Sequence, residues 1–226
     1  GQEVRARVLK RRRGRLEGIR LEVSERSPLQ VEPRCPHSGT CGGCAFQELE
    51  YGAQLASLRE QVQEAFTSAG VRAEVPPVLG CASPFGYRNK MDFTFGSKRW
   101  VEAHEPTGAP RGFAVGMHVP GRYDRVLDVH SCSLHFEEAD GLLTTAREAA
   151  QDLGLMPWDV HHHSGLLRHL VLRKGFGTGE TMVNLVTSED AHDQVDAWAA
   201  AMLRAHPYVT TLVQNVNTRL ASISFG

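Results

Sequence analysis

Three closely spaced cysteines place the strongest constraint on how this chain can fold. They occur in the run CPHSGTCGGC as Cys35, Cys41 and Cys44, with five residues and then two residues between them. Core packing does not need thiols so close together, and the spacer Gly42-Gly43 lets the backbone turn tightly around one inorganic centre. The run therefore predicts a metal-binding loop.

A fourth thiol far along the chain, Cys132, can complete a four-cysteine site. Such a site holds a zinc ion or an iron-sulfur cluster. Structural zinc sites usually pair two short-spaced couples of ligands, so a triplet plus one remote cysteine favours a [4Fe-4S] cluster, with zinc left open. Radical enzymes keep one iron free of protein ligands, so a ligand at Cys132 argues against that chemistry. Cys81 competes as the fourth ligand, but we interpret it as a small buried hydrophobic residue.

Composition sets broad limits on the class of protein. The chain has 226 residues, of which 41% are hydrophobic and 23% charged, enough for one or two domains with a real core. Its first residues are too charged for a signal peptide, and no run of about 18 apolar residues could cross a membrane. Five clustered cysteines do not resemble a secreted disulfide framework. We expect a cytoplasmic protein without membrane contact, and no obligate protein partner is evident.

Positive charge is concentrated at the start of the chain. Residues 1–34 carry ten Lys and Arg against five Glu, although the net charge of the chain is −1. Two extended runs flank a basic turn that contains Arg11, Arg12 and Arg13. This turn can be a solvated hairpin tip or a contact for a polyanion such as RNA, and its place before the cysteine loop favours RNA. We expect residues 1–32 to be the remnant of a small β-barrel.

The rest of the chain predicts an α+β fold with a central antiparallel sheet. Residues 87–96 alternate apolar and polar side chains, with Met91, Phe93 and Phe95 on one face. Further strands are expected at 113–117, 125–129, 166–174, 180–187 and 209–216. Helices are expected at 51–69, with one side on a core, from Ser133 to about 153 with Ser133 as the cap, and at 189–205. Strands and helices do not alternate regularly, which excludes a doubly wound sheet.

Two other motifs are weaker indications of function. The glycine-rich run Gly175–Gly179 joins two strands and opens no helix, so it predicts a hairpin and no nucleotide site. Three adjacent histidines, at 161–163, point in different directions and follow a proline, which favours a polar surface turn over a metal site.

Several motifs together resemble the RNA uracil-5-methyltransferases of the RumA and TrmA type. They span the whole chain and occur in this order: PRCPH at 33–37, CGGC at 41–44, YRNK at 87–90, Ser131-Cys132, LRHLVLR at 167–173, TGE at 178–180 and QNVN at 214–217. In cluster-bearing members, a cysteine triplet and a distant cysteine hold a [4Fe-4S] cluster, and Cys35, Cys41, Cys44 and Cys132 match these positions.

The resemblance implies a domain plan. Residues 1–32 correspond to part of a TRAM-like, OB-like RNA-binding barrel, residues 33–50 to the cluster loop, and residues 51–226 to the central α+β domain. Family members continue into a Rossmann-like domain that binds S-adenosylmethionine and carries the nucleophilic cysteine and the general base. We expect this chain to be the N-terminal and central part of such an enzyme, inactive alone, with no catalytic residue of its own.

The expected function is therefore RNA recognition within a methyltransferase that forms 5-methyluridine in ribosomal or transfer RNA, with ribosomal RNA favoured. The candidate phosphate contacts are Arg11, Arg12, Arg13, Arg88 and Lys90. Arg168 and Arg173 are weaker candidates because they can pair with carboxylates. A stand-alone RNA-binding metal module without catalysis is the alternative.

Overall fold

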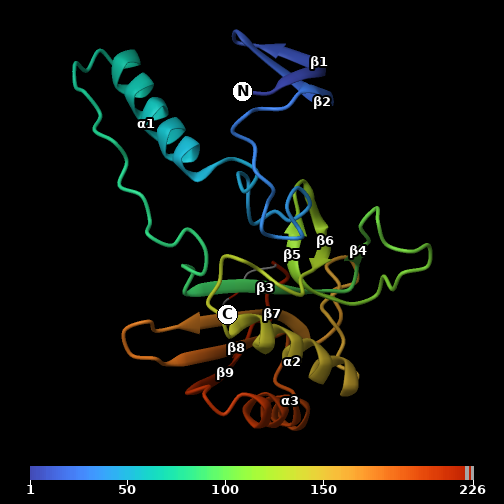
Figure 1. Ribbon diagram of the computed structural model, residues 1–226. Helices are drawn as coiled ribbons and strands as arrows, with labels where there is room; N and C mark the ends of the chain where they lie inside the picture. Colours follow the sequence, from blue (N-terminus) through green and yellow to red (C-terminus); the bar gives the residue numbers. More distant parts are fainter. Residues whose placement is uncertain (222–223, 225–226) are drawn as a thin grey trace. The chain divides into compact units, whose positions relative to one another are not determined.

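The computed structural model describes residues 1–221 and residue 224, and it divides the chain into two compact units (Figure 1). The first unit combines Gly1–Arg34 with Phe46–Cys81, and the second combines Cys35–Ala45 with Ala82–Gly226. The cysteine loop therefore belongs to the second unit, although the residues on both sides of it belong to the first. Within the described residues, no helix has the length and apolar character needed to cross a membrane.

A β-hairpin forms the start of the first unit. Strand β1 (Glu3–Arg12) pairs antiparallel with β2 (Arg15–Glu25). Arg13 and Gly14 make the connecting turn with positive φ angles of 48° and 79°, as a two-residue hairpin turn requires. This confirms the two extended runs around a basic turn. The described part of this sheet has two strands only, so the expected barrel remnant stays a prediction.

The helix of the first unit has the predicted position and an unexpected environment. Helix α1 (Tyr51–Ser68) begins at Glu50, whose carboxylate accepts hydrogen bonds from Gly52 N and Ala53 N, both at 2.9 Å. We expected one side of this helix to pack on a core, but none of its residues is buried. Leu58, on the apolar face, is 51% exposed. The prediction failed because apolar periodicity identifies a face suited to packing without showing what covers it.

A seven-stranded mixed sheet organises the second unit, in the order β4-β6-β5-β3-β7-β8-β9. Its outer pairs β4–β6 and β8–β9 are parallel and the inner pairs antiparallel. Two helices complete the unit. The elements are β3 (Lys90–Gly96), β4 (Arg99–Trp100), β5 (Ala114–Val119), β6 (Arg122–Asp128), α2 (Ala139–Asp152), β7 (Leu167–Lys174), β8 (Thr181–Thr187), α3 (His192–Ala205) and β9 (Thr211–Val216).

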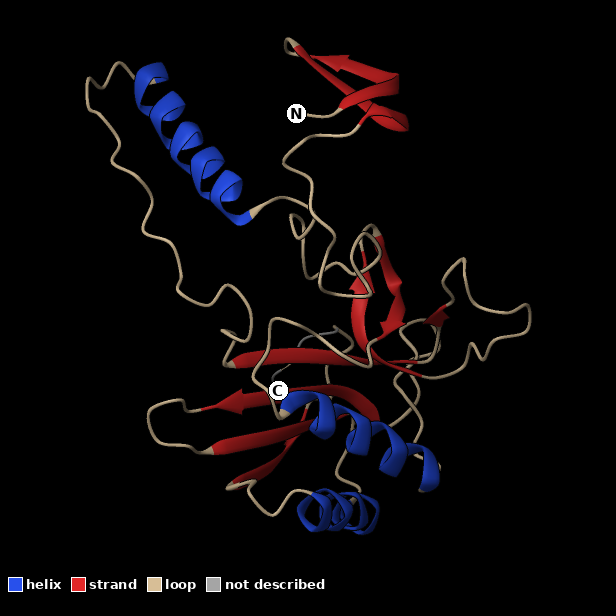
Figure 2. Cartoon of the chain, in the orientation of Figure 1, coloured by secondary structure: helices blue, strands red, loops and turns tan. Residues whose placement is uncertain are grey.

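Both helices cover the same face of this sheet and enclose the hydrophobic core (Figure 2). Met91, Phe93 and Phe95 of β3 point into the core and are at most 4% exposed, which confirms the predicted alternation. Trp198 of α3 is fully buried, and its ring N–H donates to Ala146 O of α2 at 3.1 Å. The two helices are thus fixed to each other as well as to the sheet.

The α+β class is confirmed, with two corrections. The sheet is mixed because the chain passes through α3 between β8 and β9, and such a crossover brings the next strand back in the same direction. Helix α2 begins at Ala139, so Ser133 does not cap it. Residues 132–136 form a turn instead, bonded to the segment before β3 through Gly86 N and Arg88 N.

Candidate metal centre and nucleic-acid contacts

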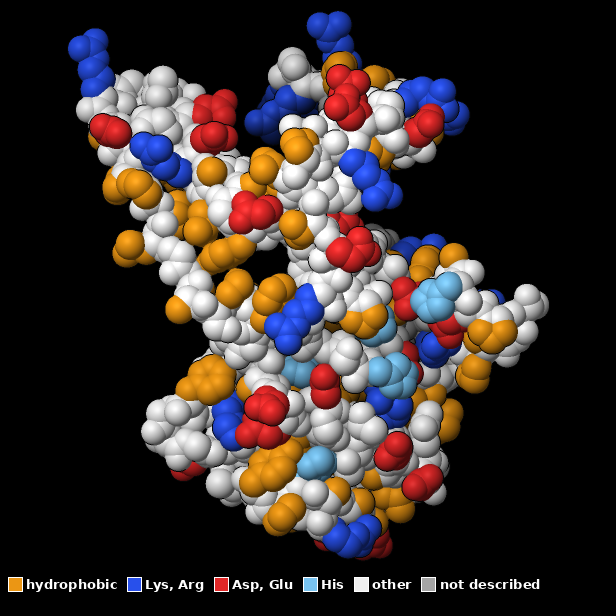
Figure 3. Space-filling model, viewed as in Figure 1, with side chains coloured by type: hydrophobic (Ala, Val, Ile, Leu, Met, Phe, Trp, Pro, Cys, Tyr) orange, Lys and Arg blue, Asp and Glu red, His pale blue; other side chains and the backbone are white. Residues whose placement is uncertain are grey.

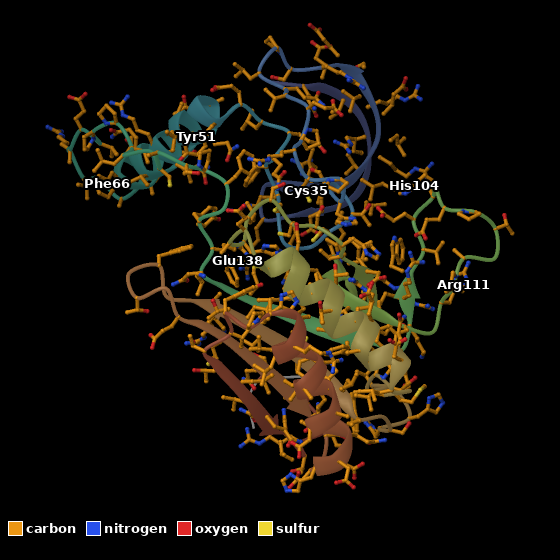
Figure 4. All side chains as sticks on the ribbon, turned by 60° about the horizontal axis from the view of Figure 1, so that its bottom comes forward. Cys35, Tyr51, Phe66, His104, Arg111 and Glu138 are labelled. Carbon is orange, nitrogen blue, oxygen red and sulfur yellow. The ribbon has the colours of Figure 1, made fainter. Side chains whose placement is uncertain are left out.

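The loop that carries the cysteine triplet is a series of tight turns. The carbonyl of His37 accepts hydrogen bonds from Thr40 N at 3.2 Å and from Cys41 N at 2.9 Å, and Ser38 N donates to Cys35 O at 3.1 Å. Each turn satisfies backbone groups within the loop, so a segment without helix or strand keeps a defined path. In Figure 4, Cys35 marks this loop and Glu138 the start of α2.

The backbone of the loop lies so close to strand β5 that the spacer must be glycine. Gly42 N donates to His118 O of strand β5 at 3.2 Å. A Cβ atom on Gly42 would lie 2.6 Å from that same carbonyl oxygen, closer than real Cβ contacts allow. The adjacent Gly43 N donates to Cys41 Sγ at 3.4 Å. The spacer therefore fastens the loop to the sheet and also supplies a hydrogen bond to one thiol.

All four predicted ligands lie in the second unit. Burial raises the pKa of the Cys41 thiol, the Gly43 N–H lowers it, and the neighbouring thiols of Cys44, Cys35 and Cys132 raise it further. Burial likewise raises the pKa of Cys132, and Cys35 and Cys44 add to the increase. The electrostatic effect of the triplet thus reaches the remote cysteine, and the four-ligand site stays a prediction.

Cys81 does not fit our interpretation of it. The residue lies at the end of the first unit and is exposed, whereas we expected a buried small hydrophobic side chain. Its backbone N–H donates to the Tyr51 hydroxyl at 2.8 Å. The prediction failed because the side chain of a lone cysteine gives no indication in the sequence of how deeply the surrounding linker is buried.

Four thiols are a donor set that both zinc sites and iron-sulfur clusters use, at different spacings. Four sulfurs around one zinc ion at 2.3 Å lie only about 3.8 Å apart, whereas thiolates on separate irons of a cluster lie further apart. Among residues 1–221 and 224, no group of three or more His, Cys, Asp or Glu side chains could hold a metal ion.

Backbone and acidic groups surround the fourth thiol. The backbone N–H groups of Leu134 and His135 lower the pKa of Cys132 against the effect of burial, and Cys132 N donates to Asp140 Oδ1 at 3.0 Å. His135 is buried, and its Nε2 lies 3.1 Å from the same Asp140 oxygen. Outer-shell partners of this kind orient metal ligands.

Sequence reasoning missed Asp140 and a second supporting residue, His37. His37 is buried within the cysteine loop, with its Nδ1 3.5 Å from Glu102 Oε2. The partner carboxylate comes from a distant loop of the same unit. No spacing pattern in the sequence could have indicated either contact.

The hairpin tip presents the first group of predicted RNA contacts. Arg11, Arg12 and Arg13 are all exposed, and Arg12 lies directly opposite Arg15 in the ladder. Like charges in register oppose pairing unless an anion neutralises them. Figure 3 shows the Lys and Arg side chains of this hairpin, in blue, with acidic side chains between them.

A second group lies at one end of the sheet. Lys90 of β3 and Arg173 of β7 are register partners and both are exposed, so their side chains stand side by side on the face opposite the helices. Lys90 Nζ lies 2.9 Å from Asp92 Oδ2, which reduces its free charge. Arg88, just before β3, is half-buried, with its Nη1 3.7 Å from Met91 Sδ.

Arg168 has a structural position, which corrects its candidacy as a phosphate contact. It is 2% exposed, and burial lowers the pKa of its guanidinium. The guanidinium donates to the carbonyls of Asn217, Arg219 and Ala221, and it lies 4.6 Å from the ring centroid of Trp158. It therefore fixes the chain segment after β9 and leaves no exposed surface for RNA.

Comparisons with known proteins agree with this picture. The chain is 33% identical to a protein of Halalkalibacterium halodurans and 34% identical to one of Chlorobaculum tepidum, both named uncharacterized RNA methyltransferases. Each alignment covers 100% of this chain and 47% or 48% of the relative. The chain thus spans about half the length of the curated relatives it matches. No family model matches it.

A solved structure shares the fold. It is the tRNA (uracil-54, C5)-methyltransferase of Pyrococcus abyssi in complex with S-adenosyl-L-homocysteine, with a TM-score of 0.65 and 23% identity. The match covers 100% of this chain and 47% of that one. Both sequence relatives are named RNA methyltransferases, and the likeness to the solved structure concerns the fold alone.

Proposed function

We propose that this chain is the RNA-recognition and cluster-binding portion of an S-adenosylmethionine-dependent methyltransferase that forms 5-methyluridine in RNA. The meeting of Cys35, Cys41 and Cys44 with the remote Cys132 carries the proposal, because the resemblance assigns these four positions to a [4Fe-4S] cluster. The names of the relatives support RNA as the substrate. Both ribosomal and transfer RNA fit this proposal.

In this proposal the chemistry at uracil belongs to another part of a longer protein. Uracil C5 becomes nucleophilic only after a thiolate adds at C6, and a base must later remove the C5 proton. In this proposal the cysteines of the loop are ligands of the metal centre and are not nucleophiles. This portion binds the RNA and orders its own loop around the cluster, which supplies a structural cross-link when bound.

RNA would contact cations of each unit, all of them exposed except the half-buried Arg88. On the hairpin these are Arg11, Arg12 and Arg13, and on the sheet they are Arg88, Lys90 and Arg173. The hairpin tip is the stronger group, because the repulsion between Arg12 and Arg15 is relieved by a phosphate. Each phosphate contact should contribute about 0.9 to the salt slope of binding on duplex RNA and about 0.7 on a single strand.

The cluster is tested by purifying the chain anaerobically and recording its absorption spectrum together with iron and sulfide content. We expect a brown protein with about four irons per chain, retained in Cys81→Ser and lost in Cys132→Ser. The two substitutions are chemically identical, so the comparison separates ligation from general loss of a thiol. A colourless protein with one zinc would overturn the cluster assignment.

RNA recognition is tested separately, by titrating a labelled uridine-rich RNA at several salt concentrations. Replacing Arg11, Arg12 and Arg13 with Gln should weaken binding across sequences and reduce the salt slope. Replacing the exposed Arg204 of α3 is the control. An RNA affinity and salt slope unchanged by the triple substitution would reject the hairpin as a contact.

A further inference from the structure

A tyrosine at the start of strand β6 exposes its ring to solvent. Among the Phe, Tyr and Trp residues that the structure describes, Tyr123 is the most exposed, at 72%. Its ring centroid lies 6.1 Å from that of His161, and the two rings are tilted by 54°. Folded proteins usually bury aromatic rings, because each ring removes a large apolar area from water. Two neighbouring rings at the surface are therefore suited to contact a ligand.

The two rings are surrounded by cations. The carboxylate of Asp124 holds them together, with Arg122 Nε and Arg125 Nε each at 3.6 Å from one of its oxygens. His161 Nε2 lies 3.8 Å from the same carboxylate. The side chain of Asp124 is only 17% exposed, whereas that of Arg122 is 51% exposed. Solvent therefore meets the rings and the guanidinium groups, and the carboxylate lies behind them.

The turn that carries His161 is held in place by a second aspartate. Asp159 Oδ1 accepts hydrogen bonds from His161 N at 2.8 Å and His162 N at 3.0 Å. Its other oxygen, Oδ2, accepts from the Ser97 hydroxyl at 3.0 Å, which ties the turn to the residue that follows β3. Groups that are already ordered lose little conformational freedom when a ligand binds. The turn thus presents the His161 ring in a fixed position.

We propose that Tyr123 and His161 form a stacking platform for one unpaired base of RNA, with Arg122 and Arg125 placed for the adjacent phosphates. The inference rests on the proposed function and adds to it a contact in the second unit. Every base has a π face, so stacking on aromatic side chains tolerates any sequence. In a duplex these faces are covered by neighbouring base pairs, so RNA bases are recognised in loops and single strands. The platform therefore favours single-stranded RNA over duplex RNA.

The ring is tested with the full chain, by fluorescence anisotropy on a labelled oligouridine and on a labelled RNA duplex of the same length. Tyr123→Ala should weaken oligouridine binding about five- to 100-fold and leave duplex binding unchanged. Tyr123→Phe keeps the ring and should bind oligouridine as the wild type does. The control is Tyr208→Ala, because Tyr208 is also exposed and its ring lies 5.5 Å from that of His206. Equal oligouridine affinities of Tyr123→Ala and the wild type, or equal losses on both RNAs, would overturn the inference.

The salt dependence of binding separates the ring from the arginines. Tyr123→Ala removes no charge, so the salt slope on oligouridine should stay the same while the affinity falls. Arg122→Gln removes one phosphate contact and should reduce that slope by about 0.7. A reduced slope in Tyr123→Ala would show that the ring acts through the arginines and would contradict stacking. An unchanged slope in Arg122→Gln would reject its phosphate contact.

Failure of the proposed function gives a different result. A wild-type chain that binds neither RNA would remove the proposed RNA role, and this inference with it. Oligouridine binding that is weakened by the substitution of Arg11, Arg12 and Arg13 but not by Tyr123→Ala would support the proposed function and overturn only the stacking platform.

Discussion

Replacing His169 with asparagine is expected to reduce the acid sensitivity of the second unit. His169 lies in β7, is 6% exposed, and has its Nδ1 3.4 Å from Thr94 Oγ1. The pKa of His169 is lowered to about 4, mainly by burial and also by the charges of Arg168 and His118, whereas Asp92 acts in the opposite direction. The folded protein therefore resists protonation of this ring.

The sign and size of the effect follow from linkage. An unfolded histidine has a pKa of about 6.5, so above that pH neither state binds the proton and stability is unaffected. As the pH falls below 6.5, the unfolded state takes up the proton and the folded state does not. Between pH 7 and pH 5 this lowers the free energy of unfolding by about 2 kcal/mol, and the loss levels off at about 3 kcal/mol below pH 4.

Urea unfolding followed by tryptophan fluorescence measures the free energy of unfolding at each pH. Trp100, Trp158 and Trp198 all lie in the second unit, so the signal reports on that unit. Between pH 7 and pH 5, the free energy of unfolding of His169→Asn should fall by about 2 kcal/mol less than that of the wild type. The control His192→Asn removes a ring that is 79% exposed and should follow the wild type. A His169→Asn profile parallel to the wild type would refute the reasoning.

Three further predictions concern the loop, the core and the segment after β9. Gly42→Ala should reduce the metal content of the purified protein, because the new Cβ would meet a carbonyl at 2.6 Å, whereas Gly177→Ala, with open space around it, should not. Trp198→Ala should lower the free energy of unfolding by about 3–5 kcal/mol in urea titrations followed by circular dichroism; a loss below about 1 kcal/mol would contradict its place in the core. Arg168→Gln should speed amide hydrogen exchange at residues 217–221. Equal exchange rates in Arg168→Gln and in the exposed control Arg173→Gln would refute the conclusion that Arg168 fixes this segment.

Local patterns in the sequence predicted much of the fold. The alternation around Phe93 gave the buried face of β3, and apolar spacing with a terminal glycine gave the extent of α1. The cysteine triplet predicted a tight loop, and Gly42 shows why that loop needs its glycines. These features depend on neighbours within a few residues, so a single sequence contains them.

Features that depend on distant contacts were not predictable in this way. Arg168 reads as one residue of an alternating strand, but the register shifts between Leu167 and His169, and its side chain is buried. The support of Cys132 by Asp140 depends on where α2 begins, which was expected at Ser133. The open face of α1 depends on what packs against it, and periodicity contains no such information.

The position of the cysteine loop also has an entropic consequence. The chain leaves the second unit after Ala45 and returns at Ala82, so α1 and its linker lie between the third and fourth thiols. A metal on all four thiols would close this excursion into a ring. Because the entropy of closing a loop grows only with the logarithm of its length, doubling the ring costs about 0.6 kcal/mol more. Insertions in the excursion between Ala45 and Ala82 can therefore vary widely in length with little effect on the centre.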